Sequence, residues 1–227
     1  MARIDALIFD FDGIVVDSEP IHLAGFQRVM KGVGVRLTRE DYYGKYLGYD
    51  DHDCFRIAAA DAGVDLAEPR IAELIAAKTE YVRRAFAESI QPLPGAAELI
   101  RAAADAGVLV AVCSGALRGE IDLAARTVGV LDCFRAIVAA EDVRRGKPDP
   151  EGYLLALDRL SVAAGRTLDA GCCVVVEDAP AGIDASRAAG MKTLAVTNSY
   201  PAGRLAAADR VVDSLMDVAL ADLDELV

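Results

Sequence analysis

Short apolar runs alternate with segments of helical pattern along most of the chain, and this alternation constrains the fold more than any other feature. Each run is mostly apolar, which suits a strand buried on both faces of a sheet. Strands that alternate with helices of about 10–15 residues are typical of a parallel sheet in a doubly wound α/β fold. The predicted strands cover Ile4–Phe9, Val108–Cys113, Ala136–Ala140, Cys172–Val176 and Thr193–Val196, and the predicted helices cover Gly95–Ala106, Leu117–Val128, Pro150–Leu160 and Pro180–Ala189.

One interval, from about Ser18 to Ser89, breaks the alternation because it contains no convincing strand pattern. Proline and glycine residues follow it at Gln91–Gly95, and such residues end helices and form turns. We therefore predict an all-helical domain at 18–89, inserted in an α/β core formed by 1–17 and 90–227. The helices expected in the insert cover Ile21–Lys31, Asp41–Tyr46, Asp50–Ala62 and Pro69–Ala87.

Composition and charge exclude several classes of protein. Hydrophobic residues make up 54% of the 227 residues, so the chain can bury a sizeable core and is not a disordered protein. The formal net charge is −12, from 24 basic and 36 acidic residues. Such a surface repels phosphate backbones, so we expect no nucleic-acid partner. A small anion can still bind, because local cations outweigh net charge at short range.

The cysteines and the apolar stretches predict the cellular compartment of the protein. The five cysteines are odd in number and show no C-x-x-C spacing, so we interpret them as buried thiols in a reducing compartment and not as a disulfide framework or a zinc site. No apolar stretch reaches the roughly 18 residues that a membrane span needs, and the N-terminal segment has no signal-peptide pattern. We therefore expect a cytoplasmic protein without a membrane partner.

The most informative polar residues follow the first apolar run. Open α/β sheets bind their ligands at the carboxyl ends of the strands, and Asp10 and Asp12 stand at this end of the first predicted strand. Gly13 permits a turn there. Two carboxylates this close repel one another unless a cation is present, so the pair is a candidate cation site. The alternative is a solvated loop with helix-capping acids.

Three further polar clusters follow or lead from other strands. The Ser114 hydroxyl and the backbone around Gly115 could bind a phosphoryl oxygen, or form an ordinary turn. Lys147 lies in a loop, where it could neutralise carboxylate and phosphoryl oxygens or remain a solvated charge. Glu177 and Asp178 end the fourth run, where they could bind Mg²⁺ or cap the following helix.

In chain order these clusters resemble the motifs of the haloacid dehalogenase superfamily, in the branch that carries a helical cap after the first strand. The resemblance implies a Rossmann-like core, a cap domain and phosphoryl transfer with Mg²⁺. It favours phosphoryl transfer over dehalogenation, since dehalogenating members lack the second acid, here Asp12. The matching segments span most of the predicted core: Asp10–Ser18, Cys113–Gly115, Gly146–Pro150 and Val176–Ile183.

The resemblance also implies a role for each catalytic residue. Asp10 would be the nucleophile that forms an aspartyl-phosphate. Asp12 would be the general acid that protonates the leaving oxygen and then the base that activates water. Ser114 and Lys147 would hold the transferring phosphoryl group. Because Asp12 must carry a proton in the first step, we expect its pKa to be raised.

The implied metal site uses residues from two of the motifs. Asp10, Asp178 and the backbone carbonyl of Asp12 would bind Mg²⁺, with Glu177 nearby or ligating. A carboxylate that attacks a phosphate monoester faces charge repulsion, which Mg²⁺ and a lysine remove. The predicted cofactor is therefore Mg²⁺.

Relatives of this branch include phosphatases of small metabolites and β-phosphoglucomutase-like proteins, which share the core and differ in the cap. The mutase grips a second phosphate with a basic pair in the cap. The corresponding positions here are Leu47 and Asp51, and neither is basic. We therefore predict hydrolysis of a small phosphorylated metabolite such as a sugar phosphate or phosphoglycolate. Mutase activity is the alternative, followed by pyrophosphatase activity.

The candidate substrate-binding residues each have a structural alternative. His22 resembles a histidine that contacts the acid/base aspartate in mutase-like relatives, or it is a partly exposed helix residue. Lys78 resembles a cap lysine that reaches the site, or it is a solvated helix lysine. Arg118 could pair with a substrate anion, with Glu120 or with Asp122. The full set is His22, Lys45, Tyr49, Lys78, Gly115 and Arg118.

Two other function classes remain as rivals. A catalytically silent binding module could use the same fold, although the full set of motif residues argues against it. A nucleotide-binding oxidoreductase would need G-x-G-x-x-G after the first strand, where this chain has Asp-Phe-Asp-Gly. We expect a monomer.

Overall fold

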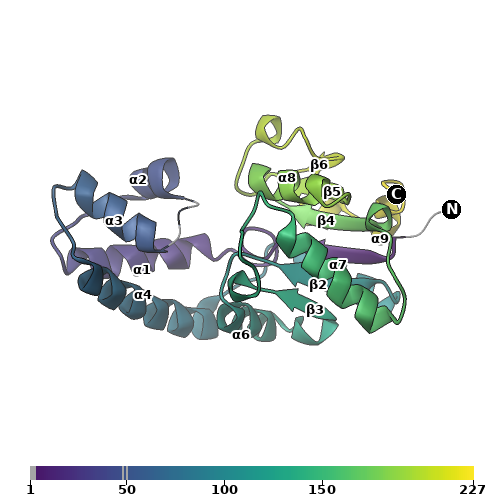
Figure 1. The fold of residues 1–227 in the computed structure, drawn as a ribbon, viewed down its shortest axis with the longest axis horizontal. Helices are drawn as coiled ribbons and strands as arrows, with labels where there is room; N and C mark the ends of the chain where they lie inside the picture. Colours follow the sequence, from purple (N-terminus) through teal and green to yellow (C-terminus); the bar gives the residue numbers. More distant parts are fainter. Residues whose placement is uncertain (1–3, 48, 50) are drawn as a thin grey trace. The chain divides into compact units, whose positions relative to one another are not determined.

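The computed structural model describes residues 4–47, 49 and 51–227, which form two compact units (Figure 1). One unit comprises the described residues up to Asp17 together with Ile90–Val227. The other unit is Ser18–Ser89.

The larger unit is built on a six-stranded sheet in the order β3-β2-β1-β4-β5-β6, in which all neighbouring strands are parallel. This arrangement confirms the predicted doubly wound α/β fold. Every residue of β1 and β4 is buried, as expected for central strands covered on both faces. The strands are β1 (Ala6–Phe9), β2 (Leu109–Cys113), β3 (Ala136–Val138), β4 (Cys173–Glu177), β5 (Lys192–Val196) and β6 (Arg210–Val212).

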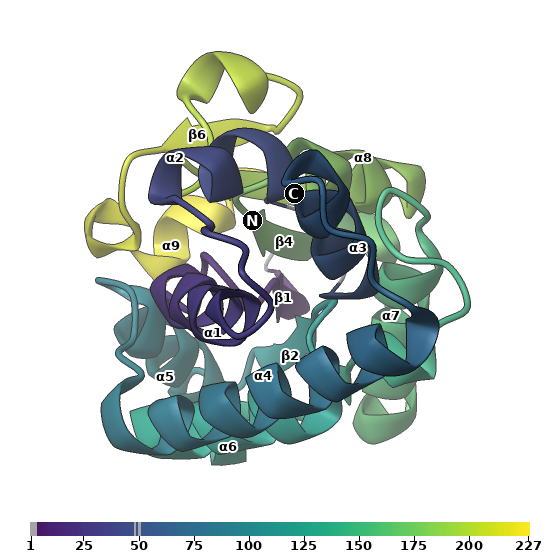
Figure 2. The same cartoon turned by 90° about the vertical axis from the view of Figure 1, so that its left-hand side faces the viewer.

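Helices cover both faces of this sheet. Figure 2 shows α7 and α8 on one side and α5 and α9 on the other. Tyr153 and Leu160 of α7 and Ala185 of α8 join the buried cluster that includes Ala6 and Ile8 of β1. The helices of the unit are α5 (Ala96–Asp105), α6 (Arg118–Val128), α7 (Glu151–Ala164), α8 (Pro180–Ala188) and α9 (Leu220–Leu223).

The sequence prediction was incomplete at the edge of the sheet, because it contained five strands and missed β6. This strand is three residues long and only half-buried, so its sequence carries no buried apolar run. The third predicted strand also ends earlier than expected, at Val138, because Ala140 begins a short 3₁₀ turn.

In the described part of Ser18–Ser89, all regular secondary structure is helical. Its elements are α1 (Glu19–Lys31), α2 (Arg39–Asp41), a π-helical turn (Tyr42–Tyr46), α3 (Asp51–Asp61) and α4 (Glu68–Ser89). Phe26, Phe55 and Ile71 from three of these helices meet in a buried apolar cluster. The unit therefore has a hydrophobic core of its own. The expected start of the third helix, Asp50, lies outside the described residues.

Two further sequence-based expectations concern the cysteines and membrane-spanning helices. All five cysteines are free thiols, and Cys133 and Cys172 are only partly buried, so the expectation of buried thiols is wrong for these two. Among the described residues, no helix combines the length and the apolar character needed to cross a membrane.

Candidate active site

A tight turn directly after β1 carries the first pair of acids. The backbone N–H of Asp10 donates to the carbonyl of Val176 in β4 (2.9 Å), and the N–H of Val15 donates back to Phe11 (2.8 Å). Gly13 has φ +78°, a conformation that favours glycine. A Cβ on Gly13 would also overlap Asp178 Oδ2. Only glycine therefore lets this turn lie against the end of β4.

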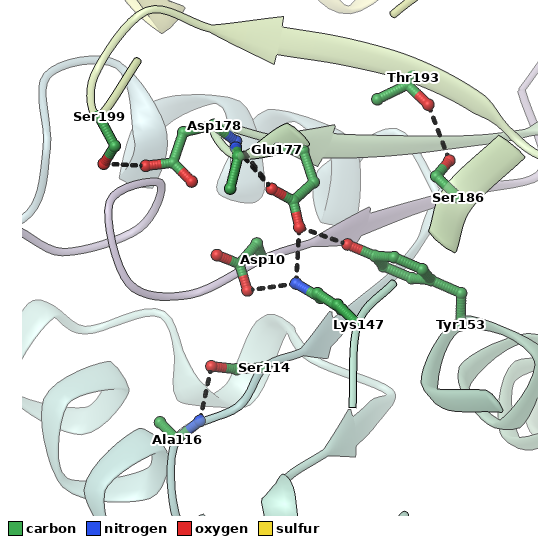
Figure 3. Close-up of polar contacts among 11 residues, drawn as sticks. Asp10, Ser114, Ala116, Lys147, Tyr153, Glu177, Asp178, Ser186, Thr193 and Ser199 are labelled. Atoms are coloured by element: carbon green, nitrogen blue, oxygen red, sulfur yellow. Dashed lines mark hydrogen bonds and ion pairs between the residues drawn. The ribbon is translucent and has the colours of Figure 1, made fainter. Parts of the chain in front are cut away.

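Lys147 connects the ends of β1 and β4. Its Nζ donates to Asp10 Oδ1 (2.7 Å) and to Glu177 Oε1 (2.6 Å), and Figure 3 shows it between the two carboxylates. The Glu151 carboxylate orders the loop before it by accepting from the backbone N–H of Arg144 (3.0 Å). Lys147 is therefore held in an ion-pair network, and the alternative of a solvated loop lysine is wrong.

Glu177 is fully buried and both of its carboxylate oxygens have protein donors. Oε1 accepts from Lys147 and from the Tyr153 hydroxyl (2.9 Å). Oε2 accepts from the backbone N–H groups of Asp178 (2.9 Å) and Ala179 (3.0 Å). A Cβ on Gly182 in the first turn of α8 would overlap the Glu177 carboxylate, so glycine is needed there too.

Asp178 completes a cluster of three buried carboxylates. One oxygen of each of Asp10, Glu177 and Asp178 lies within 4.8 Å of the others. The hydroxyl of Ser199 donates to Asp178 Oδ2. Asp178 is not the N-cap of α8, since Ala179 holds that position. Its carboxylate therefore belongs to the acidic cluster, and the helix-capping alternative is wrong for it.

The electrostatics of this cluster favour an added cation. Burial raises the pKa of Asp10 to about 7, against the opposing effect of Lys147. Burial and the charge of Asp10 raise the pKa of Asp178 to about 8. Burial lowers the pKa of Lys147, but Asp10 and Glu177 more than offset this and raise it well above its ordinary value. Lys147 therefore stays charged, and the three acidic groups of the cluster outnumber this one cation.

Mg²⁺ fits this group of residues on two counts. When all three carboxylates are ionised, their charges and that of the one ammonium sum to −3 + 1 = −2, which a divalent cation balances. The donors are hard carboxylate oxygens, which Mg²⁺ prefers. Because the Glu177 oxygens are occupied by four donors, Asp10 and Asp178 are the carboxylates better placed to take the ion.

The two candidates after β2 lie at the same end of the sheet. Ser114 is buried, and its Oγ accepts from the backbone N–H of Ala116 (3.0 Å) in a turn below Asp10 and Lys147 in Figure 3. A Cβ on Gly115 would meet nothing within 4 Å, so the space there is open.

Asp12, in the turn after β1, is partly buried and contributes to the raised pKa of Asp10.

Arg118 begins α6 and is engaged within the protein. Its Nε donates to Asp122 (3.0 Å), and its backbone N–H donates to the Glu141 carboxylate (3.1 Å). The pairing with Asp122, one of the alternatives considered from the sequence, is present.

The remaining candidates lie in the helical unit. Lys78 is only 3% exposed, forms an ion pair with Asp51 and places its ammonium 4.2 Å from the Phe26 ring centroid. The solvated-lysine alternative is therefore wrong. Lys45 is exposed and pairs with Asp41 (2.9 Å).

His22 and Tyr49 differ from the lysines in having no ion pair described for them. Burial and the charge of Lys78 lower the pKa of His22 to about 3, so His22 is neutral near pH 7. Its ring meets Phe86 edge-on, with 5.8 Å between the ring centroids. Tyr49 is 50% exposed.

Sequence reasoning missed Tyr153, Asn198 and Ser199, which contact the site or its turn. A tyrosine among the apolar residues of a helix needs a partner for its hydroxyl, and this need was a usable signal for Tyr153. Asn198 and Ser199 follow the fifth apolar run, so the rule about strand ends applied to them as well.

Comparison with known proteins gives a consistent result. A family model described as haloacid dehalogenase-like hydrolase matches residues 7–196. CbbY of Rhodobacter capsulatus is 30% identical over 231 residues, which cover 99% of each chain. Hexitol phosphatase B of Escherichia coli K12 is 32% identical over 231 residues, covering 99% of this chain and 95% of that protein. A crystal structure of a CbbY mutant from Rhodobacter sphaeroides in complex with xylulose (1,5)bisphosphate has a TM-score of 0.83 and 27% identity, covering 95% of this chain and 96% of that one. The motifs, the sheet and these comparisons together establish that the chain belongs to the haloacid dehalogenase-like hydrolase family.

Proposed function

We propose that this protein is a magnesium-dependent phosphatase that hydrolyses a small phosphorylated sugar or related metabolite through an aspartyl-phosphate on Asp10. The observation that carries the proposal is the buried cluster at the carboxyl ends of β1 and β4. There the ammonium of Lys147 binds Asp10 beside two further acids.

Asp10 is assigned as the nucleophile. Its carboxylate would attack phosphorus while the bond to the leaving oxygen breaks, and water would later hydrolyse the acyl phosphate. Lys147 reduces the repulsion between Asp10 and the incoming phosphoryl group, because its ammonium is already bound to Asp10 Oδ1. Asp12, two residues on in the same turn, is assigned the proton transfers to the leaving oxygen and from water.

Asp10 and Asp178, with the backbone carbonyl of Asp12, are the residues that would hold Mg²⁺. When bound, the ion would neutralise charge on the phosphoryl oxygens. Glu177 is assigned to positioning Lys147, because its two oxygens are already bound by four donors. Ser114 and the open backbone at Gly115 are assigned to binding the phosphoryl group.

We assign substrate selection to the helical unit, Ser18–Ser89, as the cap of this family branch. Sugar-type substrates are supported by the relatives, one named a hexitol phosphatase and one crystallised with a pentulose bisphosphate. Hydrolysis is favoured over mutase activity because Asp51 stands where mutases carry a basic residue, and it already pairs with Lys78. We further propose that the protein is cytoplasmic and monomeric.

A phosphate-release screen tests this function. The purified protein with Mg²⁺ is assayed against hexitol phosphates, xylulose 1,5-bisphosphate, phosphoglycolate and pyrophosphate, with Asp10→Asn as the blank. We expect release from at least one sugar phosphate and a loss of about 10³-fold or more in the blank. Interconversion of hexose phosphates without phosphate release would contradict the proposal. Equal activity of the wild type and Asp10→Asn would contradict it too.

A further inference from the structure

The loop that follows β5 makes two contacts with the active-site segments. Asn198 Nδ2 donates to the backbone carbonyl of Gly13 (2.7 Å), in the turn just after Asp12. The next residue, Ser199, donates through its hydroxyl to Asp178 Oδ2 (Figure 3). Both residues lie beyond the segment 7–196 that matches the family model.

These contacts join three segments that are separate in the sheet. β4 lies between β1 and β5, so the loop after β5 reaches across the end of β4 to the turn after β1. Gly13 lies so close that a Cβ there would overlap Asp178 Oδ2 and approach Ser199 Oγ to 3.1 Å. The carboxylate of Asp178 is therefore enclosed between the Gly13 backbone and the Ser199 hydroxyl.

These contacts restrict the movement of Asp178 and of the turn that carries Asp12. A carboxylate that accepts a hydrogen bond on one oxygen is held in one orientation, and partners of this kind commonly affect metal affinity 10–100-fold. Ser199 occupies Oδ2 of Asp178 in this way. Asn198 restrains the carbonyl of Gly13, the residue after Asp12, and thus the turn from which the Asp12 side chain projects.

We propose that Asn198 and Ser199 are positioning residues of the active site. Ser199 orients Asp178 for the metal ion, and Asn198 holds the turn that carries Asp12. This inference rests on the proposed function, since it assigns the two residues to the same metal and proton-transfer groups.

The chain offers a matched control in the same loop. The hydroxyl of Thr197 donates to Asp213 Oδ1 (3.0 Å), an exposed contact outside the acidic cluster. Asn198 and Ser199 are also exposed as residues, so truncating either one removes a hydrogen bond without opening a cavity in the core. Differences between these variants therefore report on what each hydrogen bond holds.

Magnesium binding tests the Ser199 assignment without using activity. Isothermal titration calorimetry with MgCl₂ is carried out on the wild type, Ser199→Ala, Ser199→Thr and Thr197→Ala. We expect binding to weaken about 10-fold in Ser199→Ala and to stay within about twofold of wild type in the other two. Equal affinity of Ser199→Ala and wild type would overturn the assignment, as would an equal loss in Thr197→Ala. A wild type that binds no Mg²⁺ would instead contradict the proposed function.

Kinetics at saturating Mg²⁺ test the Asn198 assignment. We expect Asn198→Ala to lower kcat about 10-fold with KM unchanged, because the restrained turn carries a group that acts in the chemical step. Thr197→Ala is expected to leave both constants unchanged. A rise in KM alone in Asn198→Ala, or unaltered kcat, would overturn this part of the proposal.

Discussion

Each of the two compact units contains a lysine in an ion pair, Lys147 partly buried and Lys78 buried, and the charges around the two lysines differ. Lys147 in the α/β unit contacts two carboxylates in a cluster of three, so negative charge remains in excess. Lys78 in the helical unit pairs with Asp51 and rests on the Phe26 ring. An excess of buried carboxylates indicates a site built for a further cation, whereas a one-to-one pair is already compensated.

The largest expected effect is a loss of catalytic activity when Lys147 is replaced. Lys147→Met should lower kcat about 10²–10³-fold, because it removes a cation aimed at Asp10 and the phosphoryl group. Phosphate release and a circular dichroism spectrum measure activity and fold. A folded Lys147→Met protein with activity within tenfold of wild type would remove the distinction drawn between the two sites.

The next prediction concerns the residue that makes room for Glu177. Gly182→Ala should displace the Glu177 carboxylate, lower activity about tenfold or more and destabilise the protein by about 1–3 kcal/mol. Gly119→Ala in α6 is the matched control, since a Cβ there meets nothing within 4 Å. It should stabilise the protein by about 0.5–1 kcal/mol. Urea unfolding and phosphate release compare the variants, and similar behaviour of both would contradict the tight fit.

Removing the charge of Lys78 in the helical unit should lower the stability of the protein, and neutralising its partner Asp51 should reverse part of that loss. Lys78→Met leaves Asp51 without its ion pair and should destabilise the protein by about 1–3 kcal/mol. Lys78→Met combined with Asp51→Asn should recover part of this loss, because no unpaired carboxylate remains. Thermal unfolding of the single and double variants gives the coupling free energy between Lys78 and Asp51. Additive losses would show that the pair is not compensated within the unit.

The smallest expected effect comes from an ion pair outside both buried sites. The hydrogen bond from Arg159 lowers the pKa of Asp142 from 3.8 to about 2. A lowered folded-state pKa contributes stability that is present above pH 4 and lost as the pH falls towards 2. Because about a third of the Arg159 side chain is exposed, Asp142→Asn should cost less than about 1 kcal/mol at pH 7. Urea midpoints of both proteins should converge between pH 4 and pH 2, and a constant difference would be the contrary result.

The sequence predicted those parts of the molecule that follow from strand periodicity. The acids at 10, 177 and 178 were found because each follows a buried run, and parallel strands end at one edge of the sheet. The same rule could not find Tyr153, which reaches the site from the side of α7. It gave no pairing for Lys78, because the partner Asp51 lies 27 residues away and the contact depends on how the helices pack. β6 escaped because three half-buried residues carry no periodicity.

The central position of β1 has a consequence for how the chain acquires its structure. Ala6 pairs with Leu109 on one side and with Cys173 on the other, so its neighbours follow 103 and 167 residues later in the chain. Among the residues that the structure describes, the apolar cluster of the helical unit draws on those between Leu23 and Ile75. During synthesis the strand that is made first therefore waits for two distant segments before it is paired on both sides, and contacts of such long sequence separation slow folding. The described residues of this helical cluster are all made before either strand that pairs with β1.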